Sequence, residues 1–591
     1  MYRAPVEEIA FTLKHVAGLK QALDAGRFGE LGEDLVDAIL VEAGRFASDE
    51  VAPLNKAGDE TGAVLADGAV TMPPGWRDLY RRWAEGGWNA LSAPEEGGGQ
   101  GLPMMLGAAA LEMWNSGSMA FAIGPTLTMG AVEAIEKHAS PELKATYLEK
   151  LVSGEWMGTM NLTEPQAGSD LNALRTRAEP AGDGTYRIFG QKIFITYGEH
   201  DFTDNIVHLV LARLPDAPPG TRGISLFLVP KFLVDVDGSL GARNDVFCAS
   251  IEHKLGIHAS PTCTMVYGDG RFGEAPGAVG WLVGEENRGL ACMFTMMNNA
   301  RLAVGMQGVA VAEAAYQKAL AYARERRQGR APGAAGPEMS PIVGHPDVRR
   351  NLLTMKALTQ AARAITYCCA HATDMARTGQ GDEARHWQER ANLLTPLAKA
   401  FPTDVGVEVA SLGVQVHGGM GYVEETGAAV LYRDARIAPI YEGTNGIQAI
   451  DLVTRKLPQS GGEHVAGFIG ELRADVEAVR ASNRDGFGAT AERLSAALDD
   501  LERATRFLQG ALAEGDQATA LAGATPYLRL FALAAGGAMM ARGALSGADA
   551  RQTGLVRFFA ENLVDETAAL CRRVVEGADS LAAAGALLET A

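Results

Sequence analysis

Residues 440–445 read Ile-Tyr-Glu-Gly-Thr-Asn and place a single carboxylate, Glu442, at a break in the apolar pattern. An aliphatic and aromatic approach (438–441) precedes the break, and an apolar series typical of a new helix (447–453) follows it. Gly443 permits backbone angles that other residues resist, and Thr444 is a suitable N-cap for the following helix. We therefore expect Glu442 to lie at an irregular turn among apolar neighbours.

The chemistry of Glu442 has two interpretations at this point. Burial disfavours the charged form of a carboxyl and raises its pKa, which makes it a better proton acceptor near neutral pH. The six residues alone are more typical of a capping or salt-bridged glutamate. The choice between a general base and a structural residue therefore depends on the rest of the chain.

Length and composition indicate a large globular protein. At 591 residues the chain is too long for one core, and its size suggests roughly three or four domains. Hydrophobic residues make up 47% and charged residues 21%, and the net charge of −19 argues against nucleic acid or an anionic membrane as the main partner. The six cysteines show no metal-ligand spacing and are expected to be reduced and mostly buried.

The location of the protein is predicted from what its sequence lacks. The N-terminus has no basic-then-apolar layout of a signal peptide. No uninterrupted apolar stretch reaches the ~18–20 residues that cross a bilayer. We expect a cytoplasmic protein without a membrane span.

Changes in periodicity divide the chain into four predicted domains. Residues 1–157 show helical spacing, interrupted by a glycine-rich connection at 94–101. Residues 158–285 carry short apolar runs bounded by Pro and Gly, typical of a β-domain, with strands expected at 189–196, 206–212 and 223–229. Helical spacing returns over 286–458, with an exposed loop at 329–341, and continues after a linker (458–462) through an extra helical domain at 463–591. The predicted fold class is mostly α with a central β-domain and an additional C-terminal helical domain, which we interpret as a packing or oligomerisation module.

Two neighbouring motifs in the β-region suit a flat polar ligand. Residues 163–170, Thr-Glu-Pro-Gln-Ala-Gly-Ser-Asp, form a turn that exposes amides and hydroxyls. In the strand at 190–196, Phe194 and Thr196 are two residues apart and are expected on one face, where an aromatic ring can cover a ligand ring and a hydroxyl can bond its heteroatom.

With these motifs the chain resembles the acyl-CoA dehydrogenase family, from the N-terminal helices to about Leu457. The resemblance rests on six motifs in the family's order: residues 163–170, 190–196, 298–302 (Asn-Asn-Ala-Arg-Leu), 325–329 (Glu-Arg-Arg-Gln-Gly), 415–421 (Gln-Val-His-Gly-Gly-Met-Gly), and 433–436 (Arg-Asp-Ala-Arg) leading to 441–444. The family fold, a helical domain, a β-domain and a four-helix domain, agrees with the changes in periodicity.

The resemblance implies that the cofactor is FAD, bound without a covalent link between the β-domain and the last helical domain. Leu162 and Thr163 would meet the edge of the flavin ring, Phe194 would cover its face, and Thr196 would approach its N5 atom. The remaining expected FAD contacts are Arg326 and Gln328, reaching the cofactor of a neighbouring subunit, together with Gln415, Gly418, Gly419 and Thr444. Gln328 stands where the family often carries Phe.

The resemblance also assigns the substrate and the base. Ser169, Asn298 and Arg301 match positions that line the channel for a CoA thioester. Glu442 matches the catalytic base, and Ala300 occupies the position where other branches carry it. Glu442 would take the α-proton of an acyl-CoA while hydride leaves the β-carbon for flavin N5, giving a trans-2-enoyl-CoA. The backbone N–H of Glu442 and a ribityl hydroxyl would stabilise the enolate oxygen.

The hundred-odd residues beyond Leu457 resemble the longer branch of the family, and several segments (198–201, 205–213, 251–258 and 294–298) resemble its 3-methylmercaptopropionyl-CoA dehydrogenases. The implied substrate is that thioester or a similar short acyl-CoA, with a general medium- or long-chain fatty acyl-CoA as the alternative. Remoter alternatives are an acyl-CoA oxidase and a flavoprotein scaffold without activity. The resemblance implies an electron-transfer flavoprotein as acceptor, and we expect a homodimer. His200, His208, His253 and His258 are interpreted as structural, so no metal site is predicted.

Overall fold

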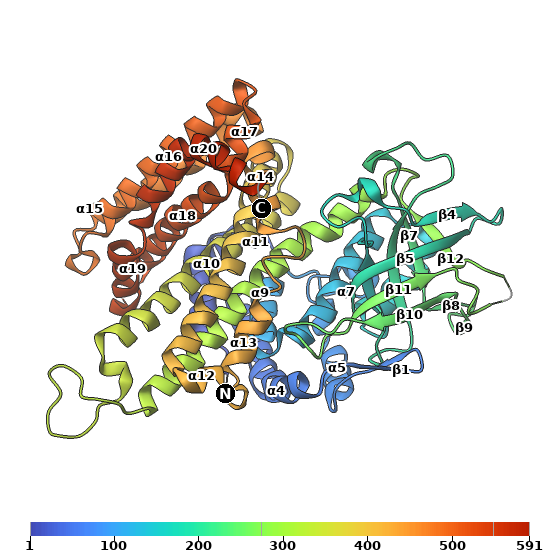
Figure 1. The fold of residues 1–591 in the computed structure, drawn as a ribbon, viewed down its shortest axis with the longest axis horizontal. Coiled ribbons are helices and arrows are strands. Elements are labelled where there is room, and N and C mark those ends of the chain that lie inside the picture. Colours follow the sequence, from blue (N-terminus) through green and yellow to red (C-terminus); the bar gives the residue numbers. More distant parts are fainter. Residues whose placement is uncertain (1, 274, 548, 590–591) are drawn as a thin grey trace. The chain divides into compact units, whose positions relative to one another are not determined.

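The computed structural model describes residues 2–273, 275–547 and 549–589 (Figure 1). They form two compact units, each assembled from segments that are far apart in the sequence. Unit 1 comprises Met1–Arg45, Ala108–Ser116 and Arg301–Ala591, and unit 2 comprises Phe46–Gly107 and Gly117–Ala300.

Unit 2 contains the β-domain. Its helices are α4 (Ala52–Thr61), α5 (Trp76–Glu85), α7 (Met119–His138) and α8 (Pro141–Val152). Its strands are β1 (Val64–Ala66), β2 (Ala69–Thr71), β3 (Met157–Asn161), β4 (Arg177–Pro180), β5 (Tyr186–Thr196), β6 (Ile206–Ala212), β7 (Ser225–Pro230), β8 (Phe232–Val234), β9 (Leu240–Arg243), β10 (Val246–Ile251), β11 (Thr262–Tyr267) and β12 (Ala278–Val283). The three strands expected from the sequence are confirmed as β5, β6 and β7.

One large sheet organises unit 2. Its strand order is β10-β11-β5-β12-β7-β6-β3, with β4 also pairing with β5. β3 and β6 run parallel and the other described pairs run antiparallel. All seven residues of β6 are buried, as expected for a central strand covered on both faces. Helix α7 packs on β3, where a side chain at Gly158 would stand 2.6 Å from the Ala131 Cβ atom.

The predicted N-terminal helical region also contains a β-hairpin that the periodicity did not predict. β1 pairs antiparallel with β2. The turn consists of Asp67 and Gly68, both with positive φ (51° and 81°). Asp-Gly is a common sequence for a tight two-residue hairpin turn, so the local signal was present, but three-residue strands are too short to show alternation.

Unit 1 is helical. It contains α1 (Val6–Phe11), α2 (Leu19–Asp24), α10 (Pro346–Thr378), α11 (Gly381–His417), α12 (Gly419–Tyr422), α13 (Ala428–Ala435), α14 (Asn445–Asp451), α15 (Glu463–Ala481), α16 (Thr490–Ala513), α17 (Gln517–Ala522), α18 (Ala524–Ser546), α19 (Ala550–Asn562), α20 (Glu566–Ala584) and α21 (Ala586–Glu589). It also contains most of α3 (Glu33–Phe46), α6 (Met104–Gly117) and α9 (Gly289–Glu325). The expected exposed loop at 329–341 contains no helix or strand.

Glycines let α9 and α11 approach closely within unit 1. A Cβ atom on Gly305 would stand 1.9 Å from the carbonyl oxygen of Ala398, and one on Gly308 would stand 2.2 Å from that of Pro402. Pro402 has no N–H, so the oxygen of Ala398 also loses its usual helical donor. The backbones of α9 and α11 therefore contact each other directly at this crossing. This contact fixes the positions of the neighbouring residues on both helices.

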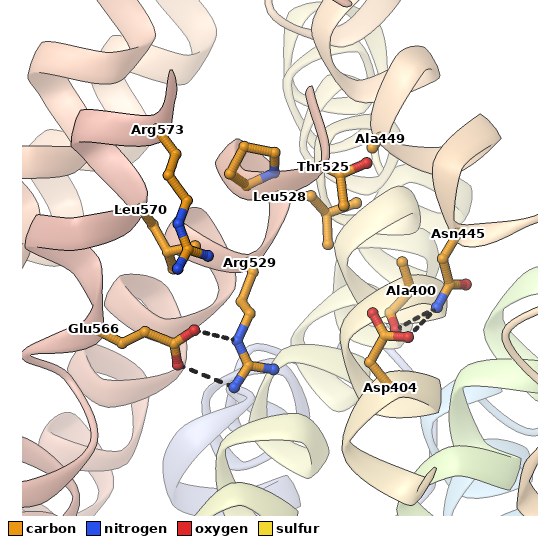
Figure 2. A pocket seen from close by; sticks show the side chains of 11 residues that line it. Ala400, Asp404, Asn445, Ala449, Thr525, Leu528, Arg529, Glu566, Leu570 and Arg573 are labelled. Carbon is orange, nitrogen blue, oxygen red and sulfur yellow. Dashed lines mark hydrogen bonds and ion pairs between the residues drawn. The ribbon is translucent and has the colours of Figure 1, made fainter. Parts of the chain in front are cut away.

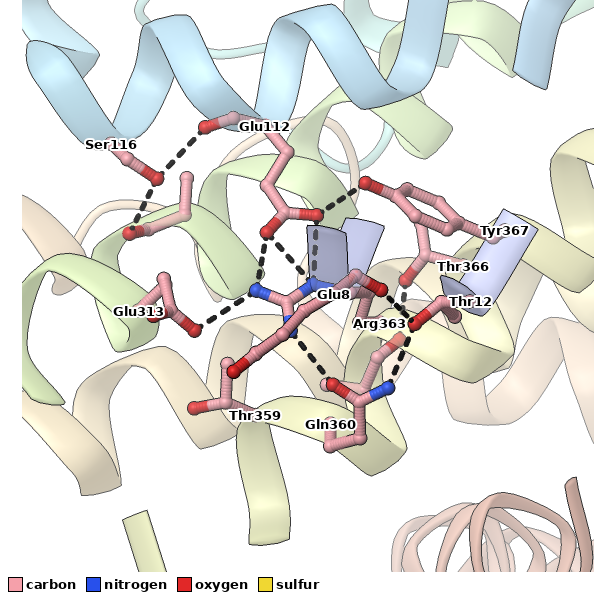
Figure 3. Close-up of polar contacts among 12 residues, drawn as sticks. Glu8, Thr12, Glu112, Ser116, Glu313, Thr359, Gln360, Arg363, Thr366 and Tyr367 are labelled. Carbon is pink, nitrogen blue, oxygen red and sulfur yellow. Dashed lines mark hydrogen bonds and ion pairs between the residues drawn. The ribbon is translucent and has the colours of Figure 1, made fainter. Parts of the chain in front are cut away.

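A buried polar network joins α6, α9 and α10 of unit 1 to the N-terminal helical segment that carries Glu8 and Thr12 (Figure 3). Arg363 on α10 is fully buried, and its Nη2 atom lies 2.6 Å from Glu112 Oε1 and 2.9 Å from Glu313 Oε2. Its Nη1 atom donates to Gln360 Oε1 at 2.8 Å. Removing any one of these side chains would destabilise the fold, because a buried charge would remain without a partner.

The C-terminal helices form as the sequence predicts. Apolar side chains at helical spacing are buried on α15 (Val465, Phe468, Ile469, Leu472, Val476 and Val479) and on α16 (Leu494, Leu498, Leu501, Ala504 and Leu508). The expected linker at 458–462 is a tight turn with positive φ at Ser460, Gly461 and Gly462. Among the described helices, α18 alone is long and apolar enough to cross a membrane, and 83% of that apolar window is buried, as in the core helix of a globular domain.

Candidate functional site

The loop between α13 and α14 carries Glu442 in an unusual backbone conformation. Glu442 has φ +54° and Gly443 has φ +81°. A residue with a Cβ atom rarely adopts the left-handed region, and such strain is concentrated at functional sites. Thr444 caps α14, with its hydroxyl accepting a hydrogen bond from the Ile447 N–H at 3.2 Å. The irregular turn and the N-cap predicted from the sequence are both confirmed.

The carboxyl of Glu442 is held in an apolar and weakly cationic environment. Its Oε2 atom is buried and has no hydrogen-bond partner within the described residues. Burial raises the pKa of this carboxyl to about 7, although the positive charges of Arg301 and Lys399 oppose that effect. Within the part of the chain that the structure describes, no salt bridge involves Glu442, so the salt-bridged interpretation has no support there. A carboxylate that titrates near neutrality is suited to proton transfer.

Lys399 on α11 is a residue of this site that sequence reasoning missed. It is fully buried, and its Nζ atom donates to the carbonyl oxygen of Gly443 at 2.8 Å and to Asn445 Oδ1 at 2.9 Å. Burial lowers the pKa of the Lys399 ammonium to about 8, against the opposing effect of Glu442. The available signal was a lysine within the apolar stretch 393–401 of a helix.

In unit 2, the loop after β3 is tied to strand β5. The Ile193 N–H donates to the Thr163 carbonyl oxygen at 2.9 Å, and Lys192 Nζ donates to that of Leu162 at 3.0 Å. Thr159 Oγ1 donates to the Thr196 carbonyl oxygen at 2.8 Å. These bonds bring the expected ring-edge residues, Leu162 and Thr163, beside the strand that carries Phe194 and Thr196.

Strand β5 is irregular where the aromatic residue lies. Between the pairs Ile195–Cys263 and Lys192–Met265, β5 has two intervening residues and β11 has one, which is a β-bulge. Phe194 occupies this bulge with φ +59° and is 58% exposed, whereas Ile195 beside it is buried. Simple alternation therefore does not describe this stretch, and the bulge presents a large aromatic ring to the surface of unit 2.

A buried ion pair that sequence reasoning overlooked supports the same loop. Lys192 Nζ lies 2.9 Å from Glu164 Oε1, with both side chains almost fully buried. Glu164 also accepts from the Arg175 N–H at 2.8 Å and from Thr176 Oγ1 at 2.6 Å. Burial would raise the pKa of this carboxyl, but Lys192 and these hydrogen bonds lower it to about 2. Glu164 is thus a charged structural centre of the 163–170 loop.

Five of the six FAD contacts expected in unit 1, all except Thr444, lie at one end of that unit. The rings of Tyr322 on α9 and His417 on α11 stack at 4.5 Å, which brings the C-terminal ends of these helices together. Arg326 and Gln328 lie in the loop after α9. Gln415 lies in the last turn of α11, Gly418 follows that helix, and Gly419 begins α12. All five residues are exposed, and a Cβ atom added to either glycine would meet nothing within 4 Å.

The expected substrate residues are distributed over both units. Ser169 is exposed on the loop of unit 2, and Arg301 is partly buried in unit 1, where its charge acts on Glu442. The side chain of Asn298 lies outside the described residues.

The four histidines considered for a metal differ in burial and in their partners. Burial lowers the pKa of His208 to about 3 and that of His200 well below its usual value. His258 pairs with Asp59 at 2.9 Å, and His253 is exposed. The described residues contain no group of His, Cys, Asp or Glu that could hold a metal ion.

The residues present suit a flavin dinucleotide. An exposed aromatic ring on a bulge can cover a flat ring system, and the neighbouring loop offers backbone and hydroxyl groups for its edge. The arginine and open glycines at the end of α9 and α11 suit a pyrophosphate, which needs cationic and close backbone contacts.

Comparison with known families and proteins agrees with this chemistry. Four family models match: the N-terminal, middle and C-terminal domains of acyl-CoA dehydrogenase at residues 35–155, 159–269 and 287–457, and an acetyl-CoA dehydrogenase C-terminal-like domain at 468–584. A 3-methylmercaptopropionyl-CoA dehydrogenase of Ruegeria pomeroyi is 46% identical, covering 98% of this chain and 99% of that protein. A butyryl-CoA dehydrogenase of Syntrophomonas wolfei is 37% identical over 80% of this chain and 78% of its own.

A solved structure shows the same fold over nearly the whole chain. The Bacillus anthracis acyl-CoA dehydrogenase complexed with FAD superposes with a TM-score of 0.74 at 21% identity, covering 98% of this chain and 93% of that one. The fold class, including the additional C-terminal helical domain, is therefore confirmed. The chain belongs to the acyl-CoA dehydrogenase family and is an FAD-dependent oxidoreductase.

Proposed function

We propose that Glu442 is the general base that removes the α-proton of an acyl-CoA thioester. One observation carries this assignment: Glu442 Oε2 is buried without a hydrogen-bond partner among the described residues, in a carboxyl whose pKa lies at about 7. A base of this kind is partly ionised at neutral pH and needs no bond to be broken before it accepts a proton. The left-handed turn and its cap restrict where the carboxyl can move.

The backbone beside the base supplies a donor for the thioester oxygen. The N–H of Glu442 donates no hydrogen bond within the described residues. We propose that it stabilises the enolate charge that develops as the α-proton leaves, since a preorganised donor is most effective where charge appears in the transition state. Bound FAD would supply the acceptor for the hydride that leaves the β-carbon, and loss of the α-proton to Glu442 would complete the conversion to a trans-2-enoyl-CoA and reduced cofactor.

The FAD contacts are proposed from the residues described above. In unit 2 they are Leu162, Thr163, Phe194 and Thr196; in unit 1 they are Arg326, Gln328, Gln415, Gly418, Gly419 and Thr444. Exposure of Phe194 and of the glycines supports this set. For the CoA thioester we propose Ser169, Asn298 and Arg301, because hydroxyl, amide and guanidinium groups suit pantetheine amides and phosphates.

The preferred substrate is proposed to be 3-methylmercaptopropionyl-CoA or a similar short acyl-CoA. The support is the 46% identity to the Ruegeria pomeroyi enzyme over nearly the full length of both proteins. This substrate would place the enzyme in the degradation of dimethylsulfoniopropionate. The second candidate is a general medium- or long-chain fatty acyl-CoA, as in β-oxidation.

Anaerobic titration of the purified holoenzyme tests the reaction and the substrate together. We expect the flavin absorbance to bleach rapidly with 3-methylmercaptopropionyl-CoA and weakly with long straight-chain thioesters. A preference for medium or long chains would transfer the enzyme to general fatty acid oxidation. Rapid reoxidation in air would indicate an oxidase, and no bleaching with any thioester would refute the dehydrogenase assignment and leave a scaffold.

We also propose a homodimer in the cytoplasm with an electron-transfer flavoprotein as acceptor. Support for the dimer is a patch of exposed large apolar side chains on α12, α13 and the turn between them: Met420 (48% exposed), Tyr422 (87%), Val423 (40%) and Tyr432 (42%). Exposed apolar clusters commonly mark protein interfaces. Light scattering should give twice the chain mass, and Tyr422→Glu should yield monomers; a monomeric wild type would refute the dimer.

A further inference from the structure

The most unusual charged group outside the assigned set is Lys399. A buried ammonium is costly unless it is paired or fully hydrogen-bonded. Lys399 is fully buried, yet within the described residues it forms no ion pair; its partners are the Gly443 carbonyl oxygen at 2.8 Å and Asn445 Oδ1 at 2.9 Å. Both belong to the three residues after Glu442. A buried cation whose neutral partners lie in the Glu442 turn and at the start of the helix that follows it indicates a role in holding that turn.

Asn445 joins this loop firmly to α11 (Figure 2). Its Nδ2 atom donates to Asp404 Oδ1 at 2.8 Å and to the Ala400 carbonyl oxygen at 3.1 Å. Thr403 Oγ1 lies 3.0 Å from the same nitrogen. The outer side of this cluster lines a pocket of about 250 Å3, which is also lined by the paired side chains of Arg529 and Glu566. The partners of Asn445 on α11 thus all lie within one turn of that helix.

The conformation that these bonds hold is a strained one. Glu442 and Gly443 both have positive φ, and Glu442 has a Cβ atom that makes this region unfavourable. From α14, Gln448 Nε2 donates to the Glu442 carbonyl oxygen at 3.3 Å. The carbonyl groups of Glu442 and Gly443 are thus fixed from α14 and α11, respectively, and Lys399 supplies the only described bond to the second.

The charges that face Glu442 come from two helices. Arg301 lies on α9 and Lys399 on α11, and both favour the ionised carboxylate. Tyr441 precedes it, with its hydroxyl donating to Gln307. The α14 residues in the cluster, Asn445 and Gln448, are neutral amides. Without Lys399, Arg301 would be the one cation among the described residues whose charge acts on Glu442.

We infer that Lys399 is a positioning residue for proton abstraction: it anchors the Glu442–Gly443 turn through Gly443 and Asn445 and supplies a positive charge that favours the ionised base. This inference rests on the proposed role of Glu442. The hydrogen bonds that hold the turn and the positive charge of Lys399 can be separated experimentally. Asn445 contributes hydrogen bonds but no charge.

Four variants of the holoenzyme separate these contributions. Lys399→Met loses the anchor and the charge, Lys399→Arg keeps the charge, and Asn445→Ala keeps the charge but loses the anchor. Lys456→Met, a partly exposed lysine paired with Asp451 in the same unit, is the matched control. FAD content and circular dichroism establish that each variant is folded.

We expect the variants to differ in kcat and in its dependence on pH. Lys399→Met should lower kcat about 10- to 100-fold with little change in KM, since misplacement of a base slows the chemical step. The ascending limb of kcat against pH should move up by about one pH unit, because loss of a cation raises the pKa of a carboxyl. Asn445→Ala should lower kcat without moving the limb, Lys399→Arg should retain the limb, and the control should match wild type.

Hydrogen–deuterium exchange supplies a measurement that does not depend on turnover. Amides of residues 440–448 should exchange faster in Lys399→Met and Asn445→Ala than in Lys456→Met. Unchanged exchange and an unmoved pH limb in Lys399→Met would overturn the inference; if that variant does not fold, Lys399→Arg and Asn445→Ala decide it. If the wild type fails to react with any acyl-CoA, the proposed function is wrong, whereas the exchange comparison still decides whether Lys399 anchors the turn.

Discussion

Replacing Glu442 by Gln should inactivate the enzyme and at the same time stabilise it. Gln preserves the size of the side chain but cannot accept the proton, so reduction of the flavin by acyl-CoA should fall by at least about 10³-fold while FAD remains bound. The stability effect arises because folding places an ionisable carboxyl in an environment that raises its pKa from 4.5 to about 7. At 1.36 kcal/mol per pKa unit, this difference amounts to about 3 kcal/mol.

The sign of the effect depends on pH. Between pH 4.5 and 7 the folded protein retains a proton on Glu442 that the unfolded chain releases, so the stability contributed by this group decreases as pH rises. Above pH 7 the full cost of burying the carboxylate is present, and below pH 4.5 it is absent. Glu442→Gln should therefore exceed wild type in free energy of unfolding by up to about 3 kcal/mol at pH 8, and by almost nothing at pH 4.5.

Urea denaturation of both holoproteins at pH 4.5, 6 and 8, with FAD in excess, measures this difference directly. Anaerobic flavin bleaching gives the activity of the same preparations. If the variant is no more stable than wild type at pH 8, the conclusion that folding raises the pKa of Glu442 is wrong. Substantial residual bleaching would instead show that another group accepts the proton.

Three further predictions follow from packing and burial. Arg363→Met should lower the free energy of unfolding by about 3–5 kcal/mol in urea denaturation, because it leaves the Glu112 carboxylate buried without its partner. Adding Glu112→Gln to that variant should therefore lower the free energy of unfolding by much less than a further ~3–5 kcal/mol. Equal, additive losses from the two substitutions would contradict this prediction. Phe194→Ala should keep the circular dichroism spectrum but release FAD at least about tenfold more readily on dialysis; unchanged retention would remove this residue from the cofactor site. Gly308→Ala should destabilise by about 1–3 kcal/mol, because its methyl group would meet a backbone oxygen of α11 at 2.2 Å, whereas Gly467→Ala in open space on α15 should not destabilise.

Sequence reasoning was most successful where one local pattern determines the result. Thr444 caps α14 because a hydroxyl before an apolar helical series suits the free N–H groups of its first turn. The stripes on α15 and α16 are buried because a helix must bury its apolar face. Strands β5, β6 and β7 formed where β-branched and aromatic runs are bounded by turn residues. Family motifs added the expectation that Glu442 is the base.

Only the tertiary structure showed what surrounds these residues. Lys399 lies 43 positions before Glu442, and no spacing rule relates a lysine in mid-helix to a distant loop. The packing of α13 and α14 on α11 brings the two together. The bulge at Phe194 depends on a partner strand that is more than sixty residues away. The pKa of Glu442 likewise depends on desolvation and charges contributed by separate helices. The sequence by itself determined the helices and strands, the turn at Glu442 and the family, because these depend on local patterns. The pKa of Glu442 and the hydrogen bonds that hold its turn depend on contacts between distant segments, which form only when the chain packs.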